Sequence, residues 1–158
     1  MSKNLLSDVD IFKGLDSPEL DLLAKSAKKM AFAENKIIFK ENEDGNKMYL
    51  ILQGTVEIWK GEGEEIKGTR LARLKQGEIF GEMALFDNEP RSATAIASIN
   101  HETKILCWNK KELSQVIQNN PKVGLKILTN VLQKVSHRLR IANEAIHTVL
   151  KSNQYIGL

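Results

Sequence analysis

The sequence predicts a mainly β domain with flanking helices, because the hydrophobic period changes twice along the chain. Apolar residues recur at helical spacing up to about Met30 and again after Asn109. The segment between them is divided into short runs rich in Ile, Val, Thr and aromatic residues, separated by turn sequences such as EDGN at 43–46. Many short strands with no long helix between them are typical of an antiparallel sandwich or barrel.

The N-terminal segment is expected to be helical. Ser17 is a suitable N-cap, and Pro18 suits the first helical position. Apolar residues then recur at helical spacing at Leu20, Leu23, Ala24, Ala27 and Met30. A shorter helix or turn that packs on the core is expected before them.

Five runs in the central segment have the composition of strands: KIIFK, KMYLILQG, TVEIWKG, TRLARLKQG and SATAIASI. The sequence EMALF, directly after Gly81, interrupts this pattern and is expected to form one short helical turn. The strands and the flanking N-terminal helices are therefore assigned to residues 1–120.

The C-terminal segment is expected to be helical again. Asn109 is a candidate cap for a helix over residues 110–117, and Pro121 can begin a long helix that reaches toward Lys151. A heptad seam follows along it: Leu128, Leu132, Val135, Leu139, Ala142, Ile146 and Val149. Packing on the chain's own strands suits the first half of this seam. The second half is expected to extend past them, which favours a homodimer. Residues 121–158 are assigned to a long lid or dimerisation helix and a tail that belong to the same domain.

Composition indicates one soluble domain of 158 residues with a net charge of +3. Residues 1–100 hold 14 Lys and Arg against 17 Asp and Glu, and residues 101–158 hold 9 against 3. The basic residues are dispersed along helical sequence, so a solvated helix face is preferred to a nucleic-acid surface. No apolar run predicts a membrane helix or a signal peptide, and a cytoplasmic location is expected.

Residue types that would indicate catalysis are not grouped in this sequence. His101, His137 and His147 lack metal-ligand spacing, and no P-loop, dinucleotide fingerprint or nucleophile elbow occurs. The single Cys107 excludes an internal disulfide and is expected to be a buried thiol. The chain is therefore predicted to be neither an enzyme nor a holder of a metal or cofactor.

The stretch GEMALFDNEPRSAT, residues 81–94, indicates a site for a phosphorylated ligand. The guanidinium of Arg91 matches two phosphate oxygens, and small residues around it let a ligand approach the backbone. A carboxylate beside an anion site, here Glu82, suits a neutral donor such as a sugar hydroxyl. The alternative is a simple Glu82–Arg91 bridge across a surface loop.

Phe80–Thr94, FGEMALFDNEPRSAT, resembles the phosphate-binding cassette of the cyclic nucleotide-binding domain family. This is the module of the catabolite activator protein and of the regulatory subunits of cAMP-dependent kinase. The resemblance extends to IFKGL at 11–15, MYLILQGTVEI at 48–58 and the two C-terminal helices. It implies an eight-stranded, jelly-roll-like antiparallel β-roll with N-terminal helices and a long C-terminal helix.

The resemblance also implies roles for individual residues. Glu82 would accept a hydrogen bond from the ribose 2′-hydroxyl, and Arg91 would bind the cyclic phosphate. Gly81, Met83, Ala84, Ser92 and Ala93 would complete the cradle, with Leu71, Ala72 and more weakly Ile58 facing the base or sugar. HRLRIANEAI at 137–146 resembles the catabolite activator's dimer helix. On that match Arg138 and Asn143 are candidates to touch the base, Asn143 across a dimer, with two solvent-facing side chains as the alternative.

The resemblance implies reversible binding of a cyclic purine nucleotide, with cAMP favoured over cGMP and a shift of the C-terminal helices on binding. Asn35 and Asn42 replace glycines that the family often has, and asparagine tolerates the positive φ of such turns. No helix-turn-helix follows SNQYIGL, so a stand-alone domain is expected. Two alternatives stay open: a DNA-binding regulator without its own recognition helix, and a regulatory partner that acts on another protein in trans.

Overall fold

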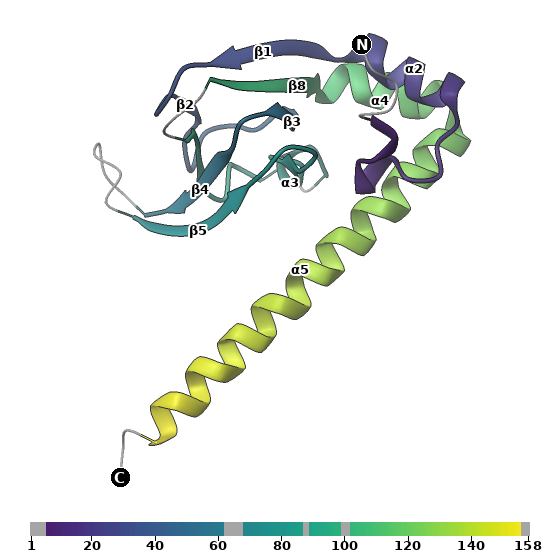
Figure 1. Cartoon of the computed structure of the whole chain (residues 1–158). Helices are drawn as coiled ribbons and strands as arrows, with labels where there is room; N and C mark the ends of the chain where they lie inside the picture. Colours follow the sequence, from purple (N-terminus) through teal and green to yellow (C-terminus); the bar gives the residue numbers. More distant parts are fainter. Residues whose placement is uncertain (1–5, 62–67, 87–88, 99–101, 156–158) are drawn as a thin grey trace.

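The structure is a computed structural model that describes residues 6–61, 68–86, 89–98 and 102–155. Within these residues two four-stranded sheets form the β-roll, and every strand pair is antiparallel (Figure 1). The first sheet has the order β1 (Lys28–Phe32), β8 (Thr103–Asn109), β3 (Lys47–Gln53) and β6 (Ile79–Phe80). The second has the order β2 (Ile37–Phe39), β7 (Thr94–Ala97), β4 (Val56–Lys60) and β5 (Thr69–Leu74). The predicted fold class is confirmed.

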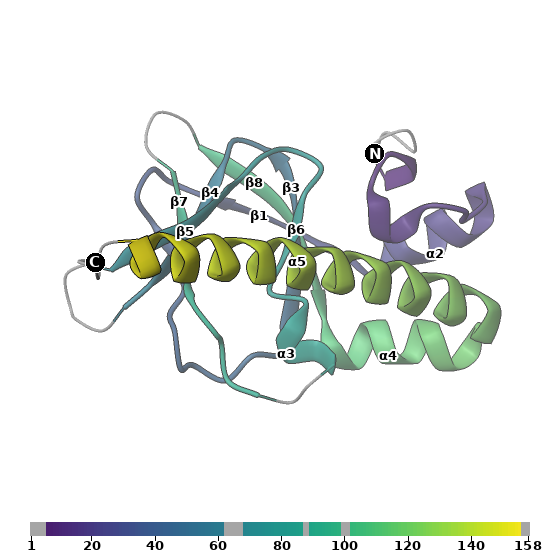
Figure 2. The same cartoon turned by 90° about the horizontal axis from the view of Figure 1, so that it is seen from below.

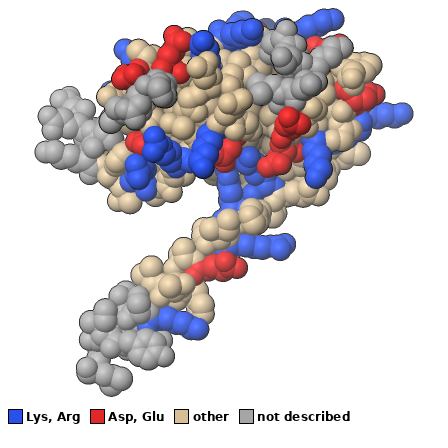
Figure 3. Space-filling model, viewed as in Figure 1, with Lys and Arg blue, Asp and Glu red and all other residues tan. Residues whose placement is uncertain are grey.

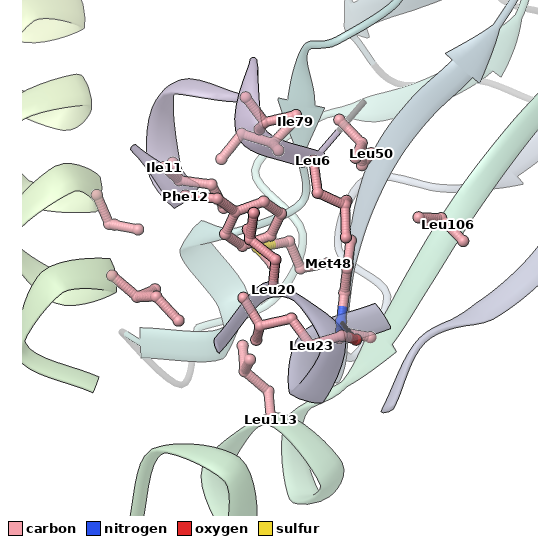
Figure 4. Packing of buried hydrophobic residues seen from close by; sticks show 14 of the residues in the cluster. Leu6, Ile11, Phe12, Leu20, Leu23, Met48, Leu50, Ile79, Leu106 and Leu113 are labelled. Carbon is pink, nitrogen blue, oxygen red and sulfur yellow. Dashed lines mark hydrogen bonds between the residues drawn. The ribbon is translucent and has the colours of Figure 1, made fainter. Parts of the chain in front are cut away.

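Two hydrophobic cores hold the domain together. One lies between the sheets and joins Tyr49 and Ile105 of the first sheet to Val56 and Ala95 of the second. The other lies between the first sheet and the helices (Figure 4), where Trp108 is fully buried and its indole N–H donates to the Leu23 carbonyl at 2.9 Å. The helices are therefore part of the folded domain and are not appendages.

The N-terminal helices begin and end at different residues from those predicted. A short 3₁₀ helix, η1 (Asp10–Phe12), precedes α2 (Ser17–Ser26). Asp16, not Ser17, is the N-cap, because its side chain accepts from the Glu19 N–H and Glu19 reciprocates in a capping box. The prediction of helix up to Met30 is wrong, since Met30 pairs with Ile105 in β1 and the sheet contact overrides the helical spacing.

The long C-terminal helix packs on the domain through a face that the heptad seam does not include. Asn109 caps α4 (Lys110–Asn119), as predicted, and α5 runs from Pro121 to Tyr155. The α5 residues buried in the core are Val123, Ile127 and Val131, whereas Leu128 and Leu132 of the seam are 43% and 66% exposed. The expectation that the seam's first half packs on the strands is therefore wrong.

Polar contacts fix the first half of α5 to the N-terminal helices. Lys126 forms an ion pair with Glu19 at 2.7 Å, and the Asn130 amide donates to the carbonyls of Ile11 and Lys13. The buried Gly124 allows α4 and α5 to approach closely, since a Cβ there would lie 2.6 Å from the Ile117 side chain. The second half of α5 passes below the β-roll and projects away from it (Figures 1 and 2).

Candidate ligand-binding site

A cavity of about 420 Å³ lies between the second sheet, the cassette (residues 80–94) and α5. Its walls are mainly apolar and include Phe39 of β2, Ile58 of β4, Leu71 of β5 and Ile141 of α5. Its polar side chains come from the cassette and from Arg138. A cavity of this volume, with apolar walls and a few convergent polar groups, has the properties of a small-molecule site.

Arg91 contributes a buried cation to one end of this cavity. The residue is 4% exposed, and its guanidinium lies 4.2 Å from the centre of the Phe39 ring. Its two terminal nitrogens donate to the Gly81 and Lys47 carbonyls, each at 2.8 Å, and its Nε is buried without a partner. Burial lowers the pKa of Arg91 from its ordinary value. No described carboxylate forms an ion pair with it, so the positive charge is available to an anionic ligand.

The backbone of the cassette holds Arg91 in this place. The Arg91 N–H donates to the Glu43 carbonyl at 2.8 Å, and the Arg91 carbonyl accepts from the Asn42 N–H at 2.9 Å. Asn42 has a φ of 65°, and Asn35 a φ of 57°, so both predicted positive-φ turns are confirmed. Gly81 has a φ of 71°, and a Cβ there would lie 2.7 Å from an Arg91 terminal nitrogen. Glycine at 81 is therefore needed for conformation and for space.

Glu82 lies at the cavity as a second buried charge, 2% exposed, just before α3 (Met83–Phe86). Its carboxylate accepts from the Arg138 guanidinium of α5, which also donates to the Ile79 carbonyl at 3.4 Å. Glu82 and Arg91 form no ion pair with each other, so the alternative of a simple bridge between them is wrong. Each charge instead has its own partners, and Glu82 connects the cassette to α5.

The fold brings most of the predicted site residues to this cavity. Those that line it are Ile58, Leu71, Ala72, Gly81, Glu82, Met83, Arg91, Ser92, Ala93 and Arg138. The Ala84 side chain lies outside the described residues, and Asn143 is exposed on α5 and does not line the cavity. Arg138, expected near a base, contacts Glu82. The ligand-binding roles of all these residues stay predictions.

Some cavity residues were missed in the sequence. Ile141 is one helical turn after Arg138, and i, i+3 spacing could have placed both side chains on one face. Phe39 was predicted only as a strand residue, although its ring stacks on Tyr49 and lies beneath Arg91. No local sequence signal identifies that contact, because the strand pairing and the cassette meet only in the folded domain.

The described residues contain no cluster of three or more His, Cys, Asp and Glu side chains that could hold a metal ion, and His101 lies outside them. No helix in the described part of the chain combines the length and apolar character needed to cross a bilayer. Cys107 is buried, and burial raises the pKa of its thiol.

The family model of the cyclic nucleotide-binding domain matches residues 29–120. The chain belongs to this family. A cGMP-dependent protein kinase of Plasmodium berghei is 32% identical to this cyclic nucleotide-binding domain over 118 residues, 73% of this chain and 13% of that protein. A cyclic AMP receptor protein of Thermus thermophilus is 31% identical over 135 residues, 84% of this chain and 58% of that protein. The chain thus spans less than two thirds of these relatives.

A solved structure agrees with this assignment. The crystal structure of a cyclic nucleotide-binding domain from Methylobacillus flagellatus has a TM-score of 0.79 and 28% sequence identity. The match covers 91% of this cyclic nucleotide-binding domain and 81% of that chain. The similarity therefore includes the helices beside the β-roll as well as the strands.

Proposed function

We propose that this domain binds cAMP in preference to cGMP and that α5 changes its position or its contacts on binding. The observation that carries the proposal is the buried Arg91 guanidinium, which faces a mainly apolar cavity and has no described carboxylate partner. A buried charge is unfavourable unless a countercharge accompanies it, and a cyclic phosphate supplies one. Glu82 lines the same cavity and would accept from a ribose hydroxyl.

The base preference rests on the apolar residues at the cavity. Leu71 is 58% exposed and Ile141 is 53% exposed, and both line the cavity, from β5 and α5 respectively. A purine between them would cover both apolar side chains. Guanine has one more polar group on its Watson–Crick edge than adenine, so its transfer to this apolar environment is less favourable. The relatives do not decide the question, since their names include both nucleotides.

Calorimetric titration of the native chain tests the proposed ligand. We expect cAMP to bind at least about tenfold more tightly than cGMP, which corresponds to one unpaired polar group on the base. 2′-Deoxy-cAMP is expected to bind about tenfold more weakly than cAMP, because Glu82 loses the ribose donor. Absence of binding by both cyclic nucleotides would refute the function. Tighter binding of cGMP would refute only the base preference.

The proposed movement of α5 rests on the contact between Glu82 and Arg138. A carboxylate has two oxygens, so Glu82 can accept from a ribose hydroxyl while Arg138 keeps its own hydrogen bond. Bound ligand would then favour the arrangement in which Arg138 and Ile141 lie over the cavity. If the ligand binds this arrangement more tightly than one in which Arg138 and Ile141 do not lie over the cavity, binding shifts the population of α5 toward it.

Arg138→Met tests this coupling, because methionine keeps apolar length and removes the guanidinium. We expect about tenfold weaker cAMP binding. Spin labels at Lys104 on β8 and Thr148 on α5 are expected to report a narrower distance distribution with cAMP in the parent chain, and no response in the Arg138→Met variant. Identical distributions with and without saturating cAMP in the parent chain would contradict the movement of α5.

The exposed apolar residues of α5 support a homodimer as part of the function. Leu132, Leu139, Ile146 and Val149 are each between 57% and 66% exposed. They repeat at the three- and four-residue spacing with which two helices pack together. A second copy of α5 supplies the matching apolar surface, and Asn143, exposed in one chain, would then lie near the dimer contact.

A further inference from the structure

Lys60, the last residue of β4, contacts the cassette from outside the cavity. Its ammonium donates to the Ser92 carbonyl at 2.8 Å and to the Glu41 carboxylate at 2.5 Å. Lys60 itself does not line the cavity. It therefore has a defined contact with the cassette backbone that the binding of a ligand does not by itself explain.

Glu41 is in turn held by the surrounding backbone. Its second carboxylate oxygen accepts from the Gly61 N–H at 3.1 Å, and its own N–H donates to the Thr94 hydroxyl at 3.0 Å. The hydrogen bond from Lys60 lowers the pKa of the Glu41 carboxyl, which favours its ionised form. The Lys60 ammonium is thus held by the Glu41 carboxylate and the Ser92 carbonyl together, although the Lys60 side chain is 53% exposed.

Two consecutive carbonyls of the cassette accept hydrogen bonds from residues outside it. The Ser92 carbonyl accepts from Lys60, which is paired with Glu41, and the Arg91 carbonyl accepts from the N–H of the next residue, Asn42. In a trans peptide the N–H points away from the C=O of the same unit. The Ser92 N–H is therefore turned away from Asn42 and the Ala93 N–H away from the Lys60 ammonium, and both Ser92 and Ala93 line the cavity.

The Ala93 N–H is a backbone donor without an acceptor among the described residues. Ala93 is 7% exposed, and no hydrogen bond from its N–H to any other described residue is found. A buried backbone N–H without an acceptor is unfavourable. Because Ala93 is two residues from Arg91, an anion held by the guanidinium would provide that acceptor.

We propose that Lys60, held by Glu41, is a positioning residue that orients the Ser92–Ala93 peptide so that the Ala93 N–H donates to a phosphate oxygen of the ligand. This rests on the proposed binding of a cyclic nucleotide. Lys60 acts through the peptide and does not touch the ligand. The competing explanation is that Lys60 only attracts the anionic ligand by its charge.

Titrations with cAMP on matched variants test the proposal. Lys60→Met is expected to weaken binding about tenfold, the effect of one hydrogen bond to a charged oxygen, and Lys60→Arg to restore most of the affinity. The control is Lys104→Met. Lys104 lies on β8 of the other sheet, has a similarly exposed side chain, 50%, and pairs with Glu102. Lys104→Met removes the same charge as Lys60→Met but leaves the cassette contact intact. Its cAMP affinity is therefore expected to stay within about twofold of that of the parent chain.

Glu41→Ala distinguishes positioning from attraction by the sign of its effect. If Lys60 acts only by charge, the loss of a nearby carboxylate strengthens cAMP binding. If Lys60 orients the peptide, the loss of its anchor weakens binding. We expect weaker binding, by about threefold to tenfold.

Phosphorothioate analogues of cAMP show whether the effect is directed at one oxygen. Sulfur replaces one or the other exocyclic phosphate oxygen in the two diastereomers. We expect Lys60→Met to change the affinity ratio of the diastereomers by about threefold or more, and Lys104→Met to leave that ratio unchanged.

Three results would overturn the assignment of Lys60 while the native chain still binds cAMP. The first is equal cAMP affinity in Lys60→Met and Lys104→Met, and the second is tighter cAMP binding by Glu41→Ala. The third is a Lys60→Met variant that loses equal affinity for both diastereomers and has a lower melting temperature than the parent chain. Failure of the native chain to bind any cyclic nucleotide would instead overturn the proposed function, and with it this inference.

Discussion

Arg91→Ala is expected to weaken cAMP binding about a hundredfold or more, a loss of about 3 kcal/mol for a bidentate, charge-assisted contact in a buried site. The stability of the ligand-free domain is expected to change by only about 1 kcal/mol. Removing the guanidinium gives up hydrogen bonds to the Gly81 and Lys47 carbonyls but also relieves an uncompensated buried charge. A large loss of binding in a folded protein is therefore the expected result.

Calorimetric titration measures the affinity, and chemical denaturation measures the free energy of unfolding. Arg70→Ala is the matched control, since Arg70 is a β5 arginine paired with Glu57 at 3.1 Å and lies outside the cavity lining. Arg91→Lys should give an intermediate affinity, because an ammonium keeps the charge but lacks the planar fork. Unchanged cAMP affinity in Arg91→Ala would refute the assignment of this residue to the phosphate.

Leu139→Asp combined with Ile146→Asp is expected to convert a homodimer into monomers at micromolar concentration. Both residues belong to the seam, and they are 60% and 57% exposed in the single chain. Each carboxylate placed in an apolar helix contact is unfavourable by roughly 2–4 kcal/mol, counting lost burial and uncompensated charge. Light scattering after gel filtration gives the molar mass directly.

The matched control places aspartate at the neighbouring positions Arg140 and His147, which are also exposed but lie outside the seam. That variant is expected to keep the molar mass of the parent chain, although it changes the net charge by a larger amount. Figure 3 shows residues other than Lys, Arg, Asp and Glu between the charged groups of the projecting part of α5. A monomeric parent chain, or a dimer that survives the seam substitutions, would contradict this interface.

Local signals predicted much of this protein correctly. The Asn109 cap, Pro121 at the start of α5, the short turn after Gly81 and the positive-φ asparagines all depend on interactions within a few residues. The cassette motif predicted the family for the same reason, since its glycine, carboxylate and arginine lie in one short segment. Such features are readable because neighbouring residues alone decide their geometry.

Predictions failed where contacts between distant segments compete with local preference. Met30 continues a helical pattern but lies in β1, because pairing with β8 satisfies its backbone and helix propensity is the weaker effect. The first half of the α5 seam was predicted to pack on the strands, yet the residues that this part of α5 buries in the core are Val123, Ile127 and Val131. Both helix faces carry apolar residues, and only the shape of the core decides which one is buried.

The sequence by itself determined the β-roll with its helices and the segment that holds Glu82 and Arg91. Only the tertiary structure decided that Arg138, 56 residues after Glu82, pairs with it, and that Lys60 binds the Ser92 carbonyl. Described side chains from β2, β4, β5 and β6 and from α3 and α5 meet at the cavity because the sheets and α5 pack around it. The physical reason is that such contacts depend on the relative placement of packed elements, which no local pattern records.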